Sequence, residues 1–136
     1  MTGIIIVNQS IGHNEYKIKR YKEEFSKLNV DLNVFVNDGT LAEFSEDRIK
    51  INIPSCDFIL YLDKDIYLAK MLEKNGYRIF NNVDFIKLCD DKVLTYIACA
   101  NKGIRMIKTF AGPLVYAPSL EENNYKFLKT IEDKIG

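Results

Sequence analysis

The chain has 136 residues, of which 47% are hydrophobic and 28% are charged, a balance typical of one soluble globular domain with a buried core. Its 19 basic and 19 acidic side chains cancel and form no long run of either sign, which disfavours a nucleic-acid-binding surface. The longest apolar runs are far shorter than the about 20 residues of a membrane-spanning helix, and the amino terminus lacks the basic segment of a signal peptide. We therefore expect a cytoplasmic protein without nucleic-acid or membrane partners.

The first half of the chain alternates between strand and helix patterns. Residues 4–7 are a continuous run of Ile and Val, which is typical of a strand buried on both faces. Apolar residues at helical spacing predict an amphipathic helix over 14–29, and alternation predicts a strand over 30–36. After a turn at 37–39, isoleucines at every second position predict a small edge strand over 49–53.

The middle of the chain continues this alternation. The pattern predicts a strand over 57–62, a helix from residue 66 to about 75, and a brief strand over 78–80. Asn82 is expected to cap a short helix, and Asp90 a second helix that ends near residue 101. Strands separated by helices of this length imply βαβ units. The predicted fold class is α/β, with an open, mainly parallel sheet flanked by helices.

The last thirty residues follow a different pattern. Residues 106–109 predict one more strand, and prolines at 113 and 118 predict an extended connector. Ser119 and Glu122 have capping-box spacing and open a helix whose apolar stripe consists of Tyr125, Leu128, Ile131 and Ile135. We expect a domain over 1–105, a linker strand and connector over 106–118, and a terminal helix over 119–136. That helix packs either on its own sheet or in a second domain.

Lys92 occupies an electrostatically unfavourable position, in the first turn of a predicted helix. The helix dipole disfavours cations there, whereas the exposed backbone N–H groups attract anions. A lysine added to such a helix start can hold a phosphate. The alternative is an ion pair with Asp90 or Asp91 on a solvated face, which residue chemistry alone favours.

Two polar segments follow predicted strands and are candidates for a ligand site. Asp63, Lys64 and Asp65 come directly after the strand over 57–62, at the edge where open α/β sheets bind ligands. An Asp-x-Asp pair can hold a divalent metal, but Asp65 is also placed to cap the next helix, and we favour that role. The loop over 8–14 follows the first strand and lacks the G-x-G-x-x-G phosphate fingerprint. We therefore expect no dinucleotide site and no metal site.

Several short motifs resemble the RimK-like branch of the ATP-grasp superfamily, which comprises ATP-dependent carboxylate–amine ligases. The motifs are Arg78–Asn82, Ile86, Cys89–Lys92, Leu94–Thr95, Gly103–Ile104 and Ile107–Thr109, and Asp57–Lys70 also looks like the corresponding strand and helix. The chain departs from the family at Met106–Ile107, where a proline usually precedes the Lys-Thr pair. That proline shapes the linker and has no chemical role.

The resemblance implies that the chain is the pre-ATP-grasp domain of such a ligase, with the first helix of the next domain. Lys92 matches the family lysine that binds the nucleotide phosphates. By position, Asn8, Ser10, Asp63, Lys64 and Asp65 would face the substrate cleft. No catalytic residue is expected in this chain.

The complete enzyme would use ATP and Mg²⁺ to join a small carboxylate or peptide to an amine, and a homodimer is compatible with the sequence. Neither cofactor is expected on this chain alone, and we expect it not to hydrolyse ATP. Two other hypotheses remain open, a stand-alone flavodoxin-like binding or regulatory domain and a fragment of a glycosyltransferase that uses Asp63 and Asp65.

Overall fold

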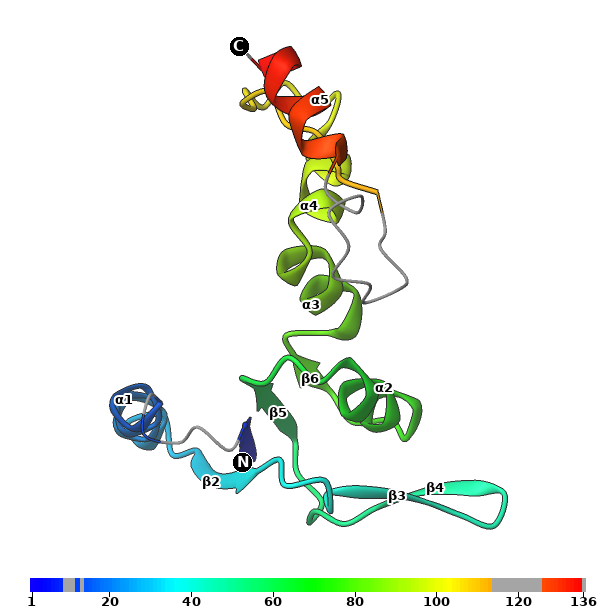
Figure 1. Ribbon diagram of the computed structural model, residues 1–136. Helices are drawn as coiled ribbons and strands as arrows, with labels where there is room; N and C mark the ends of the chain where they lie inside the picture. The colour runs from blue at the N-terminus through cyan, green and yellow to red at the C-terminus, as the bar shows by residue number, and fades with distance from the viewer. Residues whose placement is uncertain (9–11, 13, 114–125, 136) are drawn as a thin grey trace. The chain divides into compact units, whose positions relative to one another are not determined.

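The chain consists of two compact units, Met1–Asp91 and Lys92–Gly136, which are described separately. The computed structural model shown in Figure 1 describes residues 1–8, 12, 14–113 and 126–135. The division between the units precedes the helix that begins at Lys92, whereas the sequence analysis extended the first domain to residue 105.

A four-stranded parallel sheet organises the first unit. Its strands are β1 (Thr2–Val7), β2 (Asp31–Val36), β5 (Phe58–Tyr61) and β6 (Ile79–Phe80), in the order β2-β1-β5-β6. Each neighbouring pair is parallel. The predicted α/β class and all four predicted strands of this sheet are confirmed.

Helices bury both faces of the sheet, which explains the continuous apolar run in β1. Ile5 and Val7 point to the face covered by α1 (Glu15–Ser26), with Ile18 and Phe25 packed against them. Ile4 and Ile6 point to the opposite face, toward α2 (Ile66–Lys74) and α3 (Val83–Asp90). Because successive side chains of a strand alternate between faces, β1 needs an apolar residue at every position.

The helix boundaries confirm some predictions and correct others. Asp65 caps α2 and Asn82 caps α3, both through side-chain oxygens that accept backbone N–H groups, as predicted. The first helix ends at Ser26 rather than 29, since Asn29 adopts a φ of 57° and turns the chain toward β2. The prediction that Asp90 caps the next helix is wrong, because Asp90 is the last residue of α3.

A separate hairpin lies between β2 and β5 in the sequence. It pairs β3 (Ala42–Ser45) with β4 (Arg48–Ile51) in an antiparallel two-stranded sheet. The predicted strand at 49–53 is therefore confirmed in part, but it joins β3 and not the edge of the main sheet. The strand β3 was not predicted, because its alternation of Ala42 and Phe44 with polar residues is shorter than the run of isoleucines at 49, 51 and 53 that marked β4.

The second unit contains α4 (Lys92–Cys99) and α5 (Lys126–Ile135), with a segment over 104–113 that is neither helix nor strand. The prediction of a strand over 106–109 is wrong, because no described strand pairs with it and an isolated strand has unpaired backbone groups. Ser119, Glu122 and Tyr125 lie outside the described residues. Among the helices that the structure describes, none is both long and apolar enough to cross a membrane.

Candidate functional site

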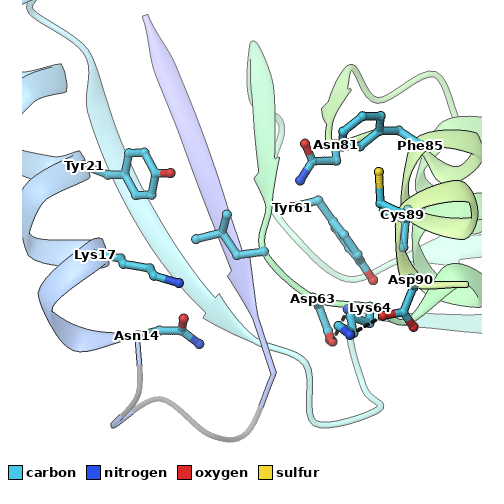
Figure 2. A pocket seen from close by; sticks show the side chains of 12 residues that line it. Asn14, Lys17, Tyr21, Tyr61, Asp63, Lys64, Asn81, Phe85, Cys89 and Asp90 are labelled. Atoms are coloured by element: carbon cyan, nitrogen blue, oxygen red, sulfur yellow. Dashed lines mark hydrogen bonds and ion pairs between the residues drawn. The ribbon is translucent and has the colours of Figure 1, made fainter. Parts of the chain in front are cut away.

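An open hollow of about 390 Å³ lies at the carboxyl edge of the parallel sheet in the first unit. Figure 2 shows that α1 forms one side, while the end of β5 and the segment from β6 into α3 form the other. Open α/β sheets bind ligands at this edge, and here the connections after β1 and β5 lead to helices on opposite faces of the sheet. The described residues that line it are Asn14, Lys17, Tyr21, Tyr61, Leu62, Asp63, Lys64, Asn81, Phe85, Ile86, Cys89 and Asp90.

Asp63 is held in place by neutral hydrogen-bond donors. Its Oδ2 accepts from the Asn37 side-chain amide at 2.8 Å, and its Oδ1 accepts from the Lys64 backbone N–H at 2.7 Å. Within the described chain no lysine or arginine lies within ion-pair distance of this half-buried carboxylate. Asp63 therefore presents a fixed negative charge to the hollow.

Asp65 has a structural role next to this carboxylate. Its Oδ1 accepts from the Tyr67 and Leu68 N–H groups at the start of α2, at 2.8 and 3.2 Å. Its Oδ2 accepts from the same Asn37 amide, at 3.1 Å. Asp65 is not among the residues that line the hollow. Its position supports the capping interpretation over an Asp-x-Asp metal site.

Lys64 crosses from the end of β5 to α3, where its ammonium pairs with Asp90. Asp90 therefore has a partner other than Lys92. Both side chains of the pair are largely exposed, so the pair adds little stability but fixes the rim of the hollow.

Tyr61 lies at the base of the hollow and is fully buried. Its hydroxyl donates to the Asp65 carbonyl oxygen at 2.7 Å. Burial, with a smaller contribution from the charges of Asp63 and Asp65, raises the pKa of the Tyr61 phenol well above its usual value. Tyr61 therefore remains a neutral hydrogen-bond donor and fixes the turn between β5 and α2.

Sequence reasoning missed the contribution of α1 to the hollow. Tyr21 was counted with the apolar stripe of this helix, yet it is 37% exposed and lines the hollow together with Lys17. The two residues are four positions apart and share one helix face. Because α1 follows the loop at the carboxyl end of β1, this face could have been assigned to the ligand edge.

Only some of the residues predicted to face the substrate cleft line the hollow in the structure. Asp63 and Lys64 line the hollow, whereas Asp65 caps α2 beneath it. Asn8 is exposed after β1 and is not among the lining residues, and Ser10 lies outside the described residues. Asn37, which the sequence analysis treated only as a turn residue, is the amide that joins the two aspartates.

The second unit has an apolar cavity of its own, of about 380 Å³. Lys92, at the start of α4, is the single charged residue among the described residues that line this cavity. Thr109, from the segment over 104–113, lines the same cavity. The lining residues are Lys92, Val93, Tyr96, Ile97, Ala100, Thr109 and Ala111. Lys92 and Thr109, which lie 17 positions apart in the sequence, thus line one cavity.

Two Mycoplasma proteins are similar to this chain. The chain is 33% identical over 94 residues to an uncharacterized protein of Mycoplasma genitalium, and equally to its homologue in Mycoplasma pneumoniae. The match covers 68% of this chain and 31% of each relative, so the chain spans about a third of the length of the curated relatives it matches. No family model matches the chain.

Proposed function

We propose that this chain is the amino-terminal domain of a cytoplasmic ATP-dependent carboxylate–amine ligase of the RimK-like ATP-grasp type. The observation that best supports the proposal is the cavity of the second unit, where Lys92 and Thr109 lie together. An apolar wall with one lysine at its rim suits a nucleotide, because the base buries apolar surface and the phosphates are anionic.

The reaction proposed for the complete protein has two steps. A substrate carboxylate oxygen attacks the γ-phosphorus of ATP, so that ADP leaves and an acyl phosphate forms. An amine then attacks the acyl carbon, the C–N bond forms and inorganic phosphate leaves. Positioning and neutralisation of phosphate charge account for most of the catalysis in such reactions, and Lys92 would supply one positive charge.

Magnesium would help to neutralise the phosphates of bound ATP. The described residues contain no cluster of three or more His, Cys, Asp or Glu side chains that could hold a metal ion. We therefore assign no metal to this chain and derive no step through one.

The proposal is tested in the full-length protein that contains this chain. We expect Lys92→Ala to weaken ATP binding at least tenfold, measured by calorimetry, since it removes a charge that binds phosphate. Lys102→Ala is the matched control, because Lys102 lies in the same unit, is exposed and does not line the cavity. Lys92→Arg retains the charge and should keep more of the affinity.

The chemistry has its own readout. A carboxylate- and amine-dependent release of ADP and phosphate is expected, and hydroxylamine should trap the acyl phosphate. Formation of AMP and pyrophosphate would contradict the proposal. Equal ATP affinity in the wild-type and Lys92→Ala proteins would also contradict it.

A further inference from the structure

The hairpin of β3 and β4 has one apolar face that the core of the first unit covers only at one end. The antiparallel register pairs Ala42 with Ile51 at that end, and both side chains pack against the buried core. The register pairs Phe44 with Ile49 nearer the turn, where Phe44 is 80% exposed. Because side chains two positions apart on a strand point to the same side, the two pairs form one continuous apolar face.

Helix α2 lies beside this face and adds a second exposed aromatic side chain. The helix contacts β4 (Figure 1). Its residues Leu68, Ala69 and Leu72 are buried in the core, whereas Tyr67 is 74% exposed. Between the helix and the hairpin lies a groove of about 310 Å³, lined by Phe44, Ile49, Tyr67, Lys70, Met71 and Lys74. None of these residues lines the hollow at the carboxyl edge of the sheet, so the groove is a separate surface.

The charged side chains of the groove are all positive among its described lining residues. Lys70 and Lys74 are exposed, lie about one helical turn apart on α2, and form no ion pair with a carboxylate of the described chain. Glu73 does not line the groove, and its Oε1 accepts instead from the Val83 N–H at 3.0 Å. A complementary ligand is therefore apolar along its middle and acidic where it meets α2.

We propose that the groove between α2 and the hairpin binds an acidic amphipathic helix of a partner protein. Apolar side chains of that helix would pack on Phe44 and Tyr67, and its carboxylates would pair with Lys70 and Lys74. Aromatic residues and methionine are enriched at protein interfaces, and the groove has all of these types. A helix presents carboxylates about one turn apart beside an apolar stripe, which matches two lysines at the same spacing. The inference does not depend on the proposed ligase function.

The other charges of the hairpin favour a protein helix over a membrane or a nucleic acid. Glu43, Glu46 and Asp47 are exposed on the hairpin, where they would repel a surface rich in phosphate. The two basic residues of the hairpin are already paired, Arg48 with Asp47 and Lys50 with Glu43. The unpaired positive charge is thus confined to one face of α2, which suits a narrow acidic ligand.

The test is a titration of the 136-residue chain into a labelled helical peptide, measured by fluorescence anisotropy. The peptide has a stripe of leucines flanked by glutamates about one turn apart, and in a matched peptide glutamine replaces every glutamate. We expect the acidic peptide to bind at least about tenfold more tightly than the glutamine peptide. The difference should shrink as salt is added, because salt screens exposed charges.

Substitutions separate the charged contacts from the apolar ones. The double variant Lys70→Gln and Lys74→Gln should weaken binding of the acidic peptide about tenfold and leave that of the glutamine peptide unchanged. Phe44→Ala should weaken binding of both peptides about tenfold, because both use the apolar face. Lys22→Gln and Tyr16→Ala are the matched controls, since both residues are exposed on α1 and neither lines the groove.

The substituted side chains of the groove are exposed, so the variants should fold, and circular dichroism checks this. The proposal is overturned if neither peptide binds, if the glutamine peptide binds as tightly as the acidic one, or if the double lysine variant binds the acidic peptide normally. It is also overturned if phosphatidylserine vesicles or poly-uridine RNA bind the chain more tightly than the acidic peptide and lose that affinity in the double lysine variant.

Discussion

The two units of the chain differ sharply in how they bury apolar surface. In the first unit, a parallel sheet with helices on both faces encloses Ile, Val and Leu side chains that are almost completely inaccessible. In the described part of the second unit no residue is buried, and Ile97 and Ile107 remain 64% and 78% exposed. The first unit therefore contains the hydrophobic core that stabilises the chain, whereas the second has apolar side chains without a core around them.

The candidate sites differ in the same way. The hollow of the first unit is lined by charged, polar and apolar side chains, and hydrogen bonds fix Asp63 and Tyr61 in place. The cavity of the second unit is mainly apolar, with one lysine, and borders the segment over 104–113, which forms neither helix nor strand. Local stability follows from local packing, so we expect the first site to be ordered more strongly than the second.

The largest effect should come from a cavity in the core of the first unit. Ile59 lies in β5 between two other strands and is fully buried, so Ile59→Ala should lower the free energy of unfolding by about 3 kcal/mol. Ile97→Ala, in the exposed face of α4, should change it by less than about 0.5 kcal/mol. Urea denaturation monitored by circular dichroism measures both. Equal losses would refute the contrast between the units.

A smaller effect is expected at the cap of α2. Asp65→Ala removes the acceptor for two backbone N–H groups and should cost about 1 to 2 kcal/mol in the same assay. Asp65→Asn should retain most of the stability, because asparagine is a comparably good capping residue. A similar cost in both variants would show that the charge, and not the cap, is what matters.

The smallest expected effect is a difference in reactivity between the native thiols of Cys56 and Cys89, which is measured in the wild-type chain. Burial raises the pKa of the Cys56 thiol, so at pH 8 a smaller fraction of Cys56 than of an ordinary thiol is in the reactive thiolate form. Cys89 is exposed and should react faster with a thiol reagent. Raising the pH should accelerate Cys56, since the thiolate forms as pH approaches its pKa.

The Ile59→Ala variant provides a check on this assay. It should increase the reaction rate of Cys56, which packs against the core, and leave that of Cys89 nearly unchanged. Peptide mapping of the labelled chain distinguishes the thiols. Faster labelling of Cys56 than of Cys89 in the wild-type chain would contradict the packing described for the first unit.

Much of the first unit could be predicted from local patterns. The run of β-branched residues at 4–7 indicated a strand buried on both faces, and Asp65 and Asn82 indicated helix starts, because capping depends on a side chain and its nearest N–H groups. The hollow was predicted only in part. Asp63 and Lys64 were placed at the ligand edge by the strand that precedes them, whereas Lys17 and Tyr21 were attributed to an ordinary amphipathic helix.

The errors share one physical cause. Residues 106–109 have the composition of a strand, but a strand requires a partner for its backbone groups, and the described chain supplies none. Aspartate is a good N-cap residue, but Asp90 is the last residue of α3 and therefore does not cap the next helix. In both cases the local sequence preference did not decide the secondary structure, because strand pairing and the extent of the neighbouring helix did.

The sequence by itself determined the α/β class, the order of the helices and of the strands of the parallel sheet in the first unit, and the residues that cap α2 and α3. These depend on periodicity and on contacts within one turn of the chain. Only the tertiary structure decided that Asn37 joins Asp63 to Asp65, that Lys64 pairs with Asp90, and that Lys17 and Asp63 line one hollow. Those relations link residues far apart in the sequence, so they depend on how the strands are ordered in the sheet and not on any local pattern.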